Sequence, residues 1–143
     1  MPKGKKKICR ALAIDPGTKR IGLAVSDELG LTAQGLDTYE LAGEDAFIAF
    51  LKDLQMRYNI EVIVLGEPRS MSGGEIEATE RSRELARLIE RELDMRVILV
   101  DERMTSLEAE RVLKQAGRIR EAGKIDRLAA VLLLQGYLDG LIR

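Results

Sequence analysis

The feature that most constrains the fold is an apolar stretch that ends in an acid and leads directly into a tight turn. Residues 11–14 read Ala-Leu-Ala-Ile and are followed by Asp15, Pro16 and Gly17. Proline fixes its own φ and glycine accepts a positive φ, so the chain can reverse here. A second apolar stretch, residues 20–26, follows at once. The pattern predicts two adjacent strands, with a carboxylate where the first strand ends.

The turn after Asp15 brings polar and basic side chains close to this carboxylate. Thr18, Lys19 and Arg20 supply a hydroxyl and two cations. An acid beside such groups is suited to a hard metal ion and a phosphate. The alternative is that Asp15 only stabilises its own turn, which aspartate often does. This segment by itself leaves both interpretations open.

Hydrophobic periodicity divides the chain into strands and helices. Strands are predicted over residues 8–15, 20–26, 31–39, 62–65 and 97–100. Helices are predicted over residues 45–58, 75–93, 105–113 and 124–138, with a basic loop over residues 116–123. Short links favour an antiparallel meander of the first three strands, and the later strand–helix alternation favours parallel strands. We therefore expect an α/β fold in one domain over residues 1–143, with a mixed sheet, helices on both faces and a flexible basic tail at residues 1–7.

Composition excludes several classes of protein. The chain has no histidine, which rules out Ser-His-Asp and Cys-His catalysis and histidine-ligated zinc sites. Its one cysteine, Cys9, cannot form an intrachain disulfide. No apolar run is long enough to span a membrane, so we expect a cytoplasmic protein with no membrane partner. Residues 1–20 carry seven Lys or Arg and one acid, so a basic patch can exist although the net charge is −1.

Acids follow the predicted strands at the edge where α/β sheets bind ligands. Asp15 ends the first strand, Glu67 follows residues 62–65, and Asp101 and Glu102 follow residues 97–100. Each acid also has an ordinary explanation: Glu67 as a solvated loop residue, and Asp101 as a surface partner of Arg103.

A further acid, Asp126, lies on an apolar helix face. Ala129, Ala130 and Leu133 follow it at helical spacing. A carboxylate on such a face is costly unless it is paired, protonated or bound to a metal. The alternative is that Asp126 stands in the first helical turn and only interacts favourably with the helix dipole.

Several carboxylates without histidine suit Mg²⁺ or Mn²⁺. Two such ions about 4 Å apart would clamp the attacking water and the leaving oxygen of a phosphodiester. Lys19, Arg20 and Arg103 would neutralise and position the phosphate.

Four short motifs in this order and spacing give the chain a specific resemblance. They are residues 15–27, residues 66–68, residues 101–106 with 108–110, and residues 125–130. Over nearly its whole length the chain resembles the YqgF (RuvX-like) family of the RNase H-like superfamily. The resemblance implies an RNase H-like fold with a five-stranded sheet and a metal-dependent nuclease. That family is linked to trimming the 5′ end of pre-16S ribosomal RNA, and also to resolving four-way DNA junctions.

The resemblance also implies which residues act. The catalytic and metal-binding acids would be Asp15, Glu102 with Asp101 adjacent, and Asp126. Glu67 departs from the family, which usually has an apolar residue there, whereas a glutamate on that strand is a metal ligand in the related junction resolvases. Glu67 is thus either an additional metal ligand or a residue that points away.

Substrate contacts are expected from the hydroxyl and basic groups near these motifs. They are Thr18, Lys19, Arg20, Arg103, Thr105, Ser106, Lys114, Arg118, Arg120 and Lys124. The expected partners are nucleic acid, with pre-rRNA first and branched DNA second, and the small ribosomal subunit. Two alternatives are a non-catalytic RNA-binding assembly factor and an ATP-binding relative of the sugar-kinase and actin type, although no GxxxxGK[ST] loop is present.

Overall fold

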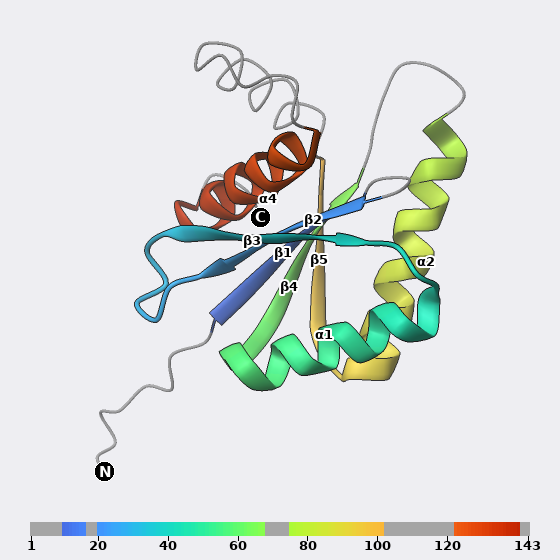
Figure 1. Ribbon diagram of the computed structural model, residues 1–143, viewed down its shortest axis with the longest axis horizontal. Helices are drawn as coiled ribbons and strands as arrows, with labels where there is room; N and C mark the ends of the chain where they lie inside the picture. The colour runs from blue at the N-terminus through green and yellow to red at the C-terminus, as the bar shows by residue number, and fades with distance from the viewer. Residues whose placement is uncertain (1–9, 17–19, 68–74, 102–121, 141–143) are drawn as a thin grey trace.

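The structure is a computed structural model of the 143-residue chain, and it describes residues 10–16, 20–67, 75–101 and 122–140. The elements, in chain order, are β1 (Arg10–Pro16), β2 (Arg20–Ser26), β3 (Ala33–Glu40), α1 (Glu44–Tyr58), β4 (Ile60–Glu67), α2 (Glu75–Leu93), β5 (Arg96–Asp101) and α4 (Ala122–Leu138) (Figure 1). The predicted tail at residues 1–7, the helix at 105–113 and most of the loop at 116–123 lie outside the described residues.

The five strands form one mixed sheet in the order β3-β2-β1-β4-β5. Strands β1, β2 and β3 pair antiparallel, whereas β1, β4 and β5 pair parallel. This confirms the predicted meander followed by parallel strands. The parallel strands end at one side of the sheet, which we call the carboxyl edge and define by Asp15, Glu67 and Asp101.

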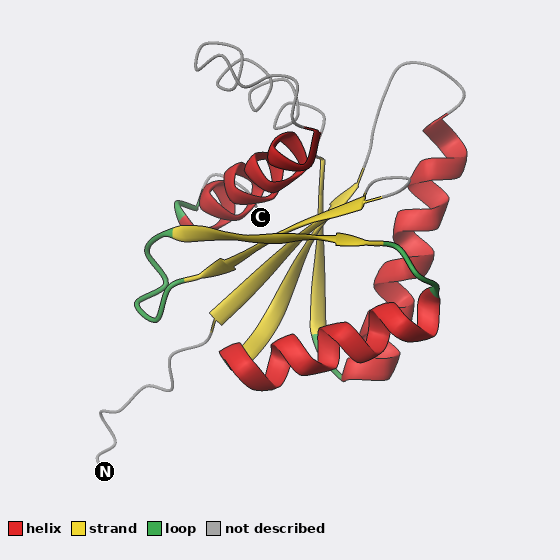
Figure 2. Ribbon diagram, in the orientation of Figure 1, coloured by secondary structure: helices red, strands yellow, loops and turns green. Residues whose placement is uncertain are grey.

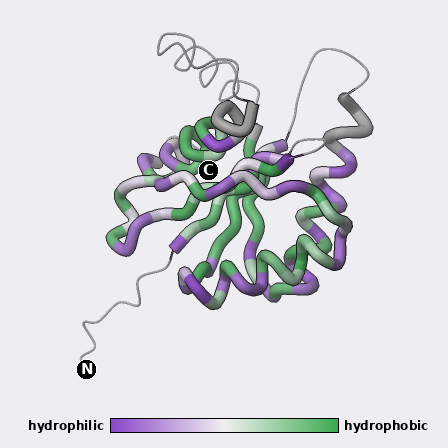
Figure 3. Tube along the Cα trace, viewed as in Figure 1, coloured by the Kyte–Doolittle hydropathy of each residue, from purple (hydrophilic) through white to green (hydrophobic). Residues whose placement is uncertain are grey.

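The sheet lies between α4 on one face and α1 and α2 on the other (Figure 2), and its central strands are largely hydrophobic (Figure 3). Each face carries an apolar core. Leu12 and Ile14 of β1 pack in the core beneath α1 and α2, and the alternate residues Ala11 and Ala13 pack in the core beneath α4. Because successive strand residues point to opposite faces, β1 serves both cores. We call these faces the α2 face and the α4 face. No helix within the described ranges is long and apolar enough to cross a membrane.

Two predicted boundaries were wrong in ways that affect the site. Strand β4 runs to Glu67, because Gly66 and Glu67 continue the pairing with Val100 and Asp101 of β5. Glu67 is therefore a strand residue and not a solvated loop residue. Helix α4 begins at Ala122, which leaves no acid in its first turn. The dipole at the helix start thus gives Asp126 no sufficient explanation, because the dipole acts mainly within the first turn.

The turn between β2 and β3 is organised by Asp27. Its Oδ1 accepts hydrogen bonds from the backbone N–H of Leu31 at 2.8 Å and of Thr32 at 3.2 Å. Its backbone N–H donates to the Thr32 carbonyl at 2.9 Å. These bonds, first that from Leu31, hold the pKa of Asp27 below its ordinary value. The ionised carboxylate therefore sets the geometry with which the chain enters β3.

The lowered pKa of Asp27 gives a stability effect with a definite pH dependence. The stabilisation is fully present above the ordinary aspartate pKa of 3.8 and is lost as the pH falls through the lower folded-state pKa. We expect Asp27→Ala to lower the urea midpoint at pH 7, and the difference from the unsubstituted chain to shrink as the pH falls below 3.8. A difference that stays constant over this range would contradict the assignment.

Candidate functional site at the carboxyl edge

Asp15 lies at the end of β1 on the α4 face. The residue is only 8% exposed, although the strand ends one residue later at Pro16. Ala11 and Ala13, which share its face by strand alternation, pack in the α4-face core. Its cross-strand partner is Gly22 of β2, which places no side chain beside the carboxylate. Asp15 is thus a largely buried acid at the ligand-binding edge of the sheet.

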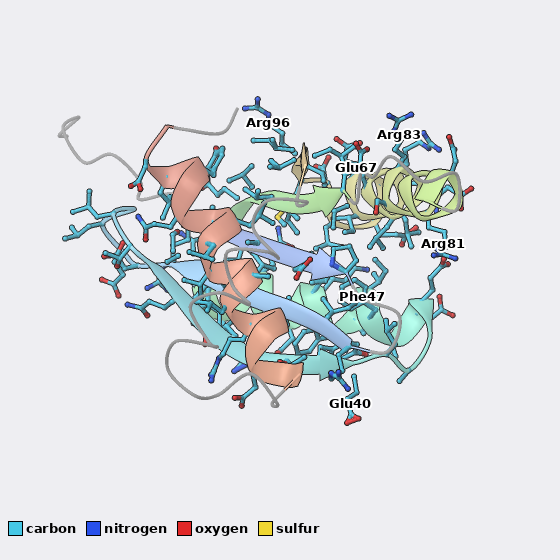
Figure 4. The ribbon with its side chains drawn as sticks, turned by 90° about the horizontal axis from the view of Figure 1, so that it is seen from above. Glu40, Phe47, Glu67, Arg81, Arg83 and Arg96 are labelled. Carbon is cyan, nitrogen blue, oxygen red and sulfur yellow. The ribbon has the colours of Figure 1, made fainter. Side chains whose placement is uncertain are left out.

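Glu67 lies on the other face of the same sheet. It is 3% exposed, and its Oε2 accepts a hydrogen bond from Nε of Arg83 at 3.2 Å. Arg83 belongs to α2, and Figure 4 shows the two side chains next to each other on that side of the sheet. Leu65, two residues before Glu67, packs in the α2-face core. Since Ile14 pairs with Leu65, strand alternation directs Asp15 and Glu67 to opposite faces.

The Arg83 contact explains how a buried glutamate is tolerated at position 67. A buried carboxylate requires a charged or hydrogen-bonding partner, and the side chain of Arg83, which is 45% exposed, keeps contact with water. Of the two hypotheses for Glu67, this geometry fits the residue that points away from the Asp15 face. Sequence reasoning missed Arg83, because α2 carries several arginines and nothing in their spacing singles this one out.

The other predicted acids are described only through their backbone or through neighbours. Asp101 pairs in register with Glu67 at the end of β5. Glu102 lies outside the described residues, but Val100, two residues before it, packs in the α4-face core. Asp126 lies within α4, and its side chain is outside the described set; Ala130, one helical turn later, is fully buried on the α4 face.

The described residues contain no group of three or more acidic, cysteine or histidine side chains close enough to hold a metal ion. The side chains of Glu102 and Asp126 lie outside the described set. Asp15 and Glu67 are the candidate acids whose side chains are described, and they point to different faces. A metal site at this edge therefore depends on which acids join Asp15 on the α4 face.

Of the predicted substrate-binding residues, Arg20 is described. It begins β2, is half-buried and pairs in backbone register with Glu40 of β3. Lys124 lies in the first turn of α4, with its side chain outside the described set. The remaining predicted residues lie outside the described ranges: Thr18, Lys19, Arg103, Thr105, Ser106, Lys114, Arg118 and Arg120.

Comparison with known proteins assigns the chain to a family. Residues 9–140 match the family model described as "RuvX: Holliday junction resolvase". A protein of Dictyoglomus thermophilum is 47% identical over 132 residues, covering 91% of this chain and 95% of the relative. A protein of Bacillus subtilis is 43% identical over 136 residues, covering 92% and 99%. Both carry the name "Putative pre-16S rRNA nuclease".

Solved structures agree on the fold. RuvC of Thermus thermophilus in complex with a Holliday junction superposes with a TM-score of 0.59 at 16% identity, covering 94% of this chain and 98% of that one. The Holliday junction resolvase of fowlpox virus gives a TM-score of 0.53 at 15% identity, covering 92% and 99%. At this identity the likeness concerns the fold. With its mixed five-stranded sheet in the RNase H-like fold, the chain belongs to the RuvX family.

Proposed function

We propose that this chain is a cytoplasmic, metal-dependent nuclease that hydrolyses phosphodiester bonds while the 5′ end of precursor 16S ribosomal RNA is processed. The observation that carries the proposal is Asp15, a carboxylate only 8% exposed at the carboxyl edge, in a chain that matches the RuvX model over residues 9–140. Relatives named as pre-16S rRNA nucleases, which this chain covers almost completely, support the substrate.

The catalytic acids in this proposal are Asp15, Glu102 and Asp126. Neighbours of each of them pack in the α4-face core: Ala13 before Asp15, Val100 before Glu102, and Ala130 after Asp126. These neighbours favour Glu102 as the second acid over Glu67, which is held by Arg83 on the other face.

Three carboxylates in a chain without histidine form a donor set that fits Mg²⁺ or Mn²⁺. These residues would hold the ion, which would supply Lewis-acid polarisation of the scissile phosphate and activation of a water molecule. The protein residues then have distinct tasks. Asp15 presents its carboxylate from a strand fixed on both sides by backbone pairing. Lys19, Arg20 and Arg103 compensate the charge of the phosphate, and Thr18, Thr105 and Ser106 donate hydrogen bonds to its oxygens.

Backbone phosphates farther from the cleaved bond would contact the basic residues Lys114, Arg118, Arg120 and Lys124. These contacts place the substrate but do not read its sequence, so specificity for the rRNA precursor would come from its shape or from the small ribosomal subunit as a partner. The second candidate function is cleavage of four-way DNA junctions, which the description of the matching family model favours.

The first expected result concerns Asp15. We expect the protein to cleave a precursor 16S RNA 5′-leader with Mg²⁺ or Mn²⁺, and Asp15→Asn to reduce kcat by at least about 100-fold, because loss of an outer-shell partner of a metal already costs 10–100-fold. The matched control is Asp94→Asn, an equally conservative change at an exposed position just before β5, at the opposite edge of the sheet. The control variant should cleave like the unsubstituted chain.

The same assay separates the candidate functions when a four-way DNA junction is tested in parallel. Junction cleavage without RNA cleavage would move the assignment to recombination. RNA binding that persists in EDTA, with no cleavage under any divalent ion, would favour a non-catalytic assembly factor. Undiminished cleavage by Asp15→Asn would refute the carboxylate mechanism.

A second expected result tests the exclusion of Glu67 from the metal site. Glu67→Leu should retain cleavage and change the free energy of unfolding by less than about 1 kcal/mol, because it removes a buried charge and leaves a half-exposed arginine that water can solvate. Arg83→Ala should destabilise the protein more, by about 1–3 kcal/mol, because it removes a partner of a buried carboxylate. Urea unfolding and cleavage of the same RNA give both readouts. Loss of cleavage in Glu67→Leu at unchanged stability would place Glu67 in the site.

A further inference from the structure

Arg127 of α4 lies closely against a glycine of the edge strand β3. A Cβ atom added to Gly35 would stand 2.8 Å from Cγ, 3.0 Å from Nε and 3.1 Å from Cδ of Arg127. Real Cβ atoms essentially never approach heavy atoms under 3.0 Å, so only glycine accommodates this side chain as it lies. A glycine within a strand often marks such a close approach.

Polar contacts hold the arginine in this position. Its Nε donates a hydrogen bond to the Leu36 carbonyl at 3.0 Å, and its Nη2 lies 3.4 Å from Oδ1 of Asp37. Both partners belong to β3. Arg127 therefore fixes the first half of α4 to the outermost strand of the sheet.

A second anchor holds the other half of α4 to the start of the same strand. Oε1 of Gln135 accepts a hydrogen bond from the Ala33 N–H at 2.9 Å, and its Nε2 donates to the Leu31 carbonyl at 2.9 Å. Arg127 and Gln135 are about 12 Å apart along a helix that rises 1.5 Å per residue. Two anchors at this separation set both the axial position and the rotation of α4.

The polar anchors add to the packing of the helix on the α4-face core. Half of the eight buried members of this core are alanines, and the others are Val64, Val100, Leu133 and Leu134. Alanine side chains interdigitate little, so that half of the surface resists sliding less than large residues would. The anchors contribute directional hydrogen bonds that apolar packing does not supply.

The contact of Arg127 with Gly35 lies close to Asp15 across the strands of the sheet. Gly35 pairs with Ala24, and Ala24 pairs with Ala13. Asp15 is the next residue of β1 on the same face. Arg127 is also the residue directly after Asp126. The contact that fixes Arg127 on β3 thus fixes the backbone of Asp126 with respect to the strand that carries Asp15.

We propose that Arg127, seated on Gly35, is a positioning residue that sets the place of Asp126 relative to Asp15. The inference rests on the proposed function, in which both acids hold the metal. Arg127 acts through α4 and does not touch the reacting atoms, because its contacts described here are made to β3.

The test is a double-mutant cycle of Gly35→Ala, Arg127→Ala and the double variant. Gln135→Ala is the control for loss of the other anchor. Three quantities are measured: Mn²⁺ binding without substrate by titration calorimetry, kcat and KM for the RNA 5′-leader, and the thermal midpoint.

We expect both single variants to weaken Mn²⁺ binding and to lower kcat by about 10-fold or more, with little change in KM. This is the size of effect seen when supports of metal ligands are lost. In the Arg127→Ala background, Gly35→Ala should add almost nothing, since the atoms that its Cβ would meet are then gone.

Gln135→Ala should lower the thermal midpoint but change Mn²⁺ binding by less than about 3-fold, because it lies more than two helical turns from Asp126. Equal loss of stability in Arg127→Ala and Gln135→Ala, with Mn²⁺ binding unchanged in both, would overturn the inference and leave Arg127 a purely structural residue. Additive effects of the two single variants would overturn the coupling to Gly35. If the unsubstituted protein neither binds Mn²⁺ nor cleaves, the proposed function fails and the inference fails with it; normal cleavage by Arg127→Ala overturns the inference alone.

Discussion

The pairing of β1 with β2 on one side and β4 on the other is the interaction on which the rest of the structure depends. The antiparallel ladder with β2 pairs Asp15 with Gly22, and the parallel ladder with β4 brings a distant part of the chain to the same edge. Each residue of β1 between Ala11 and Ile14 is buried in one core or the other. A slip of one residue would exchange these two sets and move Asp15 to the α2 face. The burial of β1 in two cores therefore fixes the register of the strand, and with it the face on which Asp15 lies.

The carboxyl edge carries acids on both faces of the sheet. On the α2 face, Glu67 is buried and held by Arg83, so its charge is compensated within the protein. On the α4 face, Asp15 stands opposite a glycine and beneath the helix that carries Asp126. In the proposed site of Asp15, Glu102 and Asp126, Glu67 would be a fourth acid at the same edge. The Glu67–Arg83 pair holds this acid on the other face of the sheet.

Much of the fold followed from local patterns in the sequence. The strands, the antiparallel meander followed by parallel strands, and the helices on both faces were predictable because periodicity and short links restrict the possible topologies. The end of β4 was not predictable, because pairing with β5 extends the strand past the apolar residues that mark it in the sequence. The start of α4 at Ala122 was not predictable either. At the site, the exit of Asp15 at the carboxyl edge was predictable. The Arg83 and Arg127 contacts join residues 16 and 91 positions apart in the chain, and no local pattern encodes such contacts.

Gly35 is a residue whose presence in a strand is explained only by the structure. Glycine weakens a strand, because it costs backbone entropy and contributes no packing. Its presence in β3 is a local disadvantage that the close approach of Arg127 offsets. The same holds for Asp15, whose carboxylate interrupts an otherwise apolar series on the α4 face. Natural sequences break local rules mainly where function requires it. Gly35 and Asp15 both depart from the local preferences of a strand, and they are connected through the pairing of β1, β2 and β3. We infer that in this region the exact placement of side chains was favoured over local stability.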